Sequence, residues 1–179
     1  MDSWHQAHPT KPLLSTEAVD ALQELARTWE EPQWEGKPLV LRSAVGTQVS
    51  LHPLVLWIVR SYLQTNFQFG HSPGFATIQP GGGTDGVGNW HSDWPYHPTM
   101  AGGYADSFGS FPTEIPFGLQ FNTCVTSFSN ANGATAFRLR SHTLNRGPPP
   151  EWHAPDQYAG GEATQFSCPA GTIILYDAR

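Results

Sequence analysis

The hydrophobic residues in the first third of the chain recur at helical spacing. Three of them share one stripe: Val19, Leu22 and Ala26. Ser15 stands before this stripe as a helix cap, so the pattern predicts an amphipathic helix over residues 16–30. A second helix is predicted over residues 53–66, because Pro53 is tolerated in a first helical turn. Its apolar residues cover more than one face, which indicates deep packing against a sheet.

From residue 67 onwards, short runs of β-forming residues alternate with glycine and proline. The predicted strands span residues 75–79, 90–94, 117–128, 134–139 and 172–176. Residues 38–42 predict a further short strand or edge segment. Within the run 117–128, strand alternation places Gln120, Asn122 and Cys124 on one face. Short strands with long connections favour a mainly β fold with flanking helices, a double-stranded β-helix or jelly roll of the cupin-like kind.

The chain of 179 residues is expected to form one domain. It divides into an irregular arm over residues 1–14, a helical part over 15–66 and a jelly-roll core over 67–179. The composition agrees with this division, since charged residues make up only 13% of the chain while there are 18 glycines and 16 prolines. Such a balance is typical of a loop-rich β domain.

Charge and cysteine content narrow the function classes. The net charge is −6 and Lys and Arg form no runs, which argues against nucleic acid as a partner because phosphate binding uses clustered cations. Cys124 and Cys168 are too few for a disulfide framework, although a single bridge stays open. They fit the cytoplasm or another reducing intracellular compartment. The longest apolar run, over residues 54–59, is far too short to span a bilayer.

The candidate chemistry lies in an aromatic and glycine-rich region around His91 and Asp93. On an extended strand, residues two apart point to the same face, so the imidazole and the carboxylate can converge on one ion. A neutral imidazole and a carboxylate belong to the ligand set that binds non-heme Fe(II) and leaves open positions for co-substrates. A His-x-Asp pair also occurs by chance in many chains. The glycine-rich approach over residues 80–88 favours an accessible site mouth over a core strand.

The order of several motifs resembles the phytanoyl-CoA dioxygenase family of Fe(II)/2-oxoglutarate oxygenases. The motifs are Trp90-His91-Ser92-Asp93, the segment 128–135 ending in Asn132-Gly133-Ala134-Thr135, the dipeptide Ser141-His142, and the strand-like segment 170–177. The resemblance covers residues 75–179. It implies a jelly roll that binds Fe(II), with His91 and Asp93 as two of the three protein ligands, and 2-oxoglutarate and O2 as co-substrates.

The resemblance further implies hydroxylation of a small organic substrate, since a carboxylate at Asp93 leaves no room for a halide. Three residues are candidates for contacts with 2-oxoglutarate: Asn122, Thr135 and Gln79. Each also has an ordinary structural interpretation as a strand or turn residue. Trp94 is a candidate for the substrate mouth, although a bulky aromatic is equally typical of a core. His142 is expected to make structural hydrogen bonds and not to bind iron.

Two departures from the family pattern bear on activity. The chain ends at Arg179, before the distal histidine and the basic residue that holds the far carboxylate of 2-oxoglutarate in the family. The Pro-Gly-Ser-His turn is replaced by Leu139-Arg140-Ser141-His142. The sequence therefore predicts a C-terminally truncated oxygenase that lacks its last strand or strands. The alternatives are an inactive jelly-roll binding module or pseudoenzyme, and a cupin-like metalloenzyme that would ordinarily carry a His-x-His cluster, which is not found here.

Overall fold

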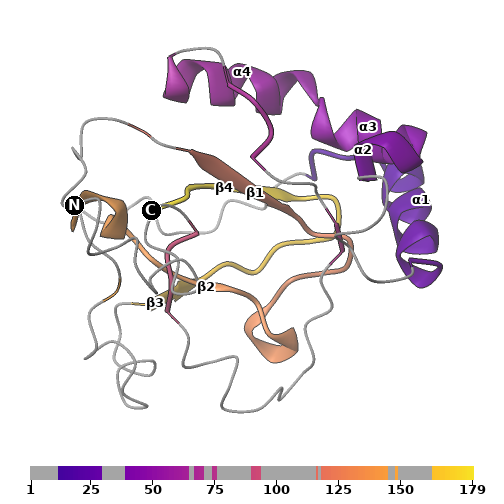
Figure 1. Cartoon of the computed structure of the whole chain (residues 1–179). Coiled ribbons are helices and arrows are strands. Elements are labelled where there is room, and N and C mark those ends of the chain that lie inside the picture. Colours follow the sequence, from indigo (N-terminus) through magenta and orange to yellow (C-terminus); the bar gives the residue numbers. More distant parts are fainter. Residues whose placement is uncertain are drawn as a thin grey trace.

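The computed structural model describes residues 12–29, 39–64, 67–70, 74–75, 90–93, 116, 118–144, 148 and 163–179. The helices in this part are α1 (Thr16–Arg27), α2 (Leu39–Arg42), α3 (Ala44–Ser50) and α4 (Pro53–Leu63). The strands are β1 (Leu119–Thr123), β2 (Ala136–Arg138), β3 (Ala163–Gln165) and β4 (Ile173–Asp177). Two short 3-10 helices, η1 (Asn130–Asn132) and η2 (Ser141–Leu144), flank β2. Figure 1 shows α1, α2 and α3 gathered at one end of the molecule, with α4 running above the β1–β4 pair in this view.

Helix α1 confirms the first predicted helix, and its apolar stripe forms the centre of the hydrophobic core. The buried members of this core are Leu14, Ala18, Val19, Leu22 and Val49. Val125, Ala170 and Ile173 pack against them from the β1–β4 region, so the core joins the helices to the sheet. The turn before β4 fits closely under α1, because the Gly171 carbonyl accepts hydrogen bonds from the backbone of Leu13 and Leu14. Gly171 has a φ of +86°, and a side chain there would lie 3.0 Å from Val19.

The predicted cap of α1 is also present, and it gives a stability prediction. The Ser15 hydroxyl accepts a hydrogen bond from the Ala18 backbone N–H at 3.3 Å. Replacing Ser15 by alanine leaves that N–H without its side-chain acceptor, so we expect the free energy of unfolding to fall by about 1 kcal/mol. Urea denaturation followed by circular dichroism measures this change. An unchanged midpoint and slope would show that water replaces the cap without cost.

The segment around residue 40 is helical, so the strand predicted over residues 38–42 is wrong. Leu39 is buried in α2, and Gly46 of α3 lies so close that an added Cβ would be 2.4 Å from the Leu39 carbonyl oxygen. The Thr47 hydroxyl also donates to the Val40 carbonyl at 2.5 Å. These contacts between α2 and α3 satisfy backbone groups that a strand would have paired with a neighbour, which explains why local β propensity did not decide the structure.

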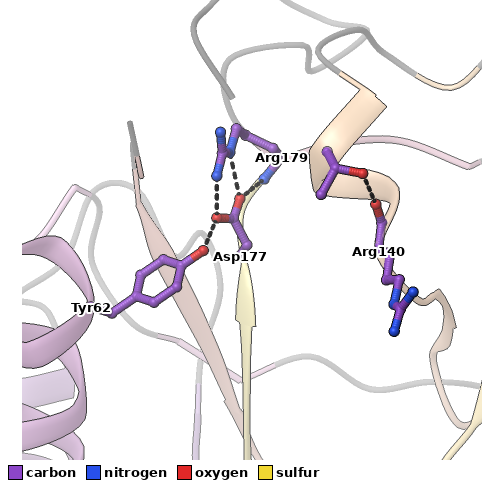
Figure 2. A network of polar contacts seen from close by, with 5 residues as sticks. Tyr62, Arg140, Asp177 and Arg179 are labelled. Atoms are coloured by element: carbon purple, nitrogen blue, oxygen red, sulfur yellow. Dashed lines mark hydrogen bonds and ion pairs between the residues drawn. The ribbon is translucent and has the colours of Figure 1, made fainter. Parts of the chain in front are cut away.

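Helix α4 was predicted to begin at Pro53, and it does, but it is less deeply packed than its apolar sequence indicated. Val55 and Val59 are buried, whereas the side chain of Trp57 is 65% exposed and Leu54 also faces outwards. Figure 2 shows how the end of α4 is held: the Tyr62 hydroxyl donates to the Asp177 carboxylate at the end of β4. Arg179 binds the same carboxylate with two side-chain nitrogens, at 2.9 and 2.8 Å.

The strands form two small antiparallel sheets. β1 pairs with β4, with Gln120 opposite Tyr176 and Asn122 opposite Ile174. β2 pairs with β3, and a bridge between Phe128 and Cys168 extends the first ladder beyond β1. The strands predicted over 117–128, 134–139 and 172–176 thus correspond to β1 with its bridge, β2 and β4.

Other strand predictions had different outcomes. Residues 90–93 form no strand, which corrects that prediction, and β3 was not predicted. Of the strand predicted over residues 75–79, only Phe75 lies within the described residues, while residue 94 lies outside them. Helices beside small antiparallel sheets agree with a β-rich domain, and closure into a jelly roll stays a prediction. Within the described residues, no helix is long and apolar enough to cross a membrane.

Candidate metal and co-substrate site

His91 and Asp93 point toward each other in the structure. The distance from His91 Nε2 to Asp93 Oδ1 is 3.4 Å, and Ser92 between them is buried. Two donors that bind one ion at about 2.1 Å each, about 90–110° apart, are separated by about 3.0–3.5 Å. The observed spacing therefore fits adjacent ligands of a single ion, although the segment reaches this geometry without the expected strand.

The pair is open to solvent on one side. The His91 side chain is 45% exposed and that of Asp93 is 25% exposed. An open metal site needs such access, since co-substrates must reach the ion. Among the described residues there is no group of three or more His, Cys, Asp or Glu side chains that could hold a metal ion. Of the three protein ligands that were predicted, the described residues therefore supply two, His91 and Asp93.

Asn122, a predicted co-substrate contact, lies on β1, which pairs with the strand that carries Tyr176. Tyr176 lies opposite Gln120 in the β1–β4 ladder, and Asn122 stands two residues further along β1. Burial raises the pKa of Tyr176, and the negative charge of Asp93 raises it further, so the phenol keeps its proton throughout the neutral range. The charge of Asp93 thus acts on a tyrosine that lies opposite Gln120 of β1, and a contact of Asn122 with a co-substrate stays a prediction.

A cation lies over the ring of Trp90, the residue that precedes the pair. The guanidinium carbon of Arg138, on β2, is 5.2 Å from the ring centroid of Trp90, which directly precedes His91. At this distance the ring face attracts the cation. Arg138 was not among the predicted site residues, because nothing in its local sequence shows that β2 passes beside residue 90.

The remaining predicted site residues are less closely connected to the pair. Thr135 is half-buried directly before β2 and makes no hydrogen bond to His91 or Asp93 in the described part of the chain. Gln79 and Trp94 lie outside the described residues. His142 lies in η2 and is half-buried. Tyr176 was not singled out from the sequence, because the effect of the Asp93 charge on its pKa depends on long-range packing.

The two cysteines are free thiols buried beside one another where the β1–β4 ladder ends. Burial raises the pKa of the Cys124 thiol to about 11, with a further contribution from neighbouring Cys168. Burial also raises the pKa of Cys168. Because the thiolate is the reactive form, both cysteines are expected to be poor nucleophiles at neutral pH.

Comparison with known proteins agrees with the motif order. The family model for phytanoyl-CoA dioxygenase (PhyH) matches residues 16–179, which includes α1, His91, Asp93 and the four strands of the described part of the chain. No curated protein and no solved structure gave a significant match. The match spans nearly the whole chain, and on this ground the chain belongs to the phytanoyl-CoA dioxygenase family.

Proposed function

We propose that this protein is an Fe(II)- and 2-oxoglutarate-dependent dioxygenase that hydroxylates a small organic substrate. Membership of the family implies an oxygenase-type enzyme with a small-molecule substrate and O2. The observation that carries the specific proposal is the 3.4 Å approach of His91 Nε2 and Asp93 Oδ1. We also propose that the chain forms a single domain whose strands belong to a jelly roll.

His91 and Asp93 are the proposed protein ligands described here. A neutral imidazole and a carboxylate suit Fe(II), and their partial exposure leaves room for further ligands. Bound Fe(II) and 2-oxoglutarate would supply the activation of O2 for hydroxylation. The task of the chain is to hold the ion, orient the co-substrate and limit the access of water.

Two side chains near the pair are suited to an anionic co-substrate. Asn122 can donate an amide hydrogen bond to a carboxylate, and it lies on β1 two residues from Gln120, which is opposite Tyr176. Arg138 brings a positive charge next to Trp90. A hydrogen bond between an ionised donor and a carboxylate contributes about 1.5–3 kcal/mol. Arg138 is therefore the described cation that we propose to attract 2-oxoglutarate.

The proposal is tested by anaerobic titration of the protein with Fe(II) and 2-oxoglutarate. Chelation of the ion by the keto acid is expected to give a weak visible charge-transfer band. Glutarate is the matched control, because it has the same five-carbon chain and two carboxylates but no keto group. A band that appears with Fe(II) and 2-oxoglutarate, but not with Fe(II) and the control acid, supports the proposal. If neither acid gives a band, the chain does not assemble the co-substrate complex, and an inactive binding module is then the better interpretation.

A further inference from the structure

The ring of Trp90 joins the segment of the metal pair to strand β2. The guanidinium carbon of Arg138 lies 5.2 Å from the centroid of this ring, a distance at which an aromatic face attracts a cation. Nε of Arg138 and Nε1 of Trp90 are both buried, so water is kept away from these two atoms. A cation–π contact is stronger when it is desolvated. A side chain of β2 therefore holds the residue that directly precedes His91.

Strand β2 is a well-fixed support for Arg138. It pairs with β3, and Arg138 lies opposite Ala163 in this ladder. The neighbouring Phe137 ring meets that of Tyr176 edge to face, with centroids 5.0 Å apart, which joins β2 to β4. The backbone position of Arg138 is thus set by contacts with both small sheets.

The segment that carries the metal pair is not part of a regular element. Residues 90–93 belong to no helix or strand, so side-chain contacts contribute to their position. Ser92 is buried and Trp90 is half-buried, whereas 45% of the His91 side chain is exposed. The segment is therefore anchored through the residues on either side of His91, and the position of Trp90 bears directly on that of the imidazole.

We propose that Arg138 is a positioning residue, which through its contact with Trp90 holds the segment in the conformation that brings His91 and Asp93 together for a divalent ion. The inference rests on the proposed function, because it takes His91 and Asp93 as the ligands. This role differs from the attraction of 2-oxoglutarate, since it applies before any co-substrate is bound. Without the contact, a smaller fraction of the protein has the binding conformation, and the apparent metal affinity falls in proportion to this fraction.

Positioning and charge have opposite effects on metal binding. A guanidinium near a divalent cation repels it, so removal of the charge alone should tighten metal binding or leave it unchanged. Loss of the cation–π contact should weaken metal binding instead. The usual strength of such a contact corresponds to a loss of about 3–30-fold in affinity. The sign of the change therefore separates the two effects of Arg138.

The test is Mn(II) titration in the absence of 2-oxoglutarate, using electron paramagnetic resonance to measure the free ion. The variants are Arg138→Met, Trp90→Leu and the double variant. We expect each single variant to bind Mn(II) about 3–30-fold more weakly than the original protein. The double variant should bind no more weakly than the weaker single variant, because both changes remove the same contact. Arg138→Lys keeps a cation for the ring and should retain part of the affinity.

Arg140 and Trp57 provide matched controls for the loss of a charge and of an indole. Arg140 is exposed two residues beyond Arg138, and Trp57 is exposed on α4. We expect Arg140→Met and Trp57→Leu to leave Mn(II) binding unchanged. Equal weakening in Arg138→Met and Arg140→Met would overturn the inference, because it would show a general effect of charge.

Other outcomes separate this inference from the proposed function. Unchanged or tighter Mn(II) binding in Arg138→Met would overturn the inference while leaving the proposed function intact. Losses that add in the double variant would also overturn it, because they would show two independent effects on the fold. Metal binding that does not depend on His91 would instead reject the proposed site, and the inference with it.

Discussion

Replacing His91 by alanine is expected to weaken divalent metal binding by more than about 100-fold, beyond the 10–100-fold that loss of an outer partner costs. The reason is that the imidazole is one of the two donors that converge at 3.4 Å, and the remaining carboxylate of Asp93 cannot hold a transition metal tightly alone. Anaerobic titration with Fe(II), or with Mn(II) in air, measures the affinity. The band expected with 2-oxoglutarate should disappear in the same variant.

His142→Ala is the matched control for this experiment. His142 is also a histidine of a short irregular segment, but it lies in η2 and is predicted to be structural. We expect metal affinity to be retained in this variant. If His142→Ala loses the metal and His91→Ala keeps it, the site has been assigned to the wrong histidine, and the His-x-Asp pair is then a chance match.

Removing the carboxylate of Asp177 is expected to lower the free energy of unfolding by about 3–5 kcal/mol, the usual cost of leaving a buried ion-pair partner without its counter-charge. The side chains of Arg179 and Asp177 are only 4% and 6% exposed, and their contact is bidentate. Asp177 also accepts from Tyr62, so the variant frees α4 from β4 (Figure 2). Urea denaturation of Asp177→Ala at pH 7 measures the loss.

The exposed ion pair of α1 is the control for the buried pair of Asp177 and Arg179. Glu24 and Arg27 form a salt bridge whose side chains are both largely exposed. Solvent screens such a pair, so Glu24→Ala should change the free energy of unfolding by at most about 1 kcal/mol. Similar losses in Glu24→Ala and Asp177→Ala would show that burial does not strengthen the contribution of the Asp177 network.

The stabilisation by Asp177 should depend on pH in a defined direction. Burial alone would raise the pKa of Asp177, but hydrogen bonds from Arg179 and Tyr62 outweigh it and hold the pKa below its usual range. A lowered pKa in the folded state means that the stabilisation is fully present above the unfolded pKa of about 4. It is then lost as the pH falls through the lower folded value. The difference in unfolding free energy between the original protein and Asp177→Ala should therefore narrow below about pH 4.

Local elements with a strong sequence signal were predicted well. The apolar stripe and the Ser15 cap identified α1, and Pro53 identified the start of α4, because both signals act within one or two helical turns. The segment at residue 40 was predicted wrongly, because a close approach across Gly46 decides its structure. The strand β3, Ala-Thr-Gln, was missed because it carries no large apolar residue, whereas β2 has Phe137.

For the candidate site too, some features were predicted from the sequence and others depend on long-range packing. The sequence by itself determined the family, the His91 and Asp93 pair and the polar face of β1, since motif order and alternation are properties of the chain alone. Only the tertiary structure decided that β4 pairs with β1, which sets Tyr176 opposite Gln120, and that Arg138 lies over Trp90. These neighbours come from strand register and from the path of β2, which depend on long-range packing that no local pattern records.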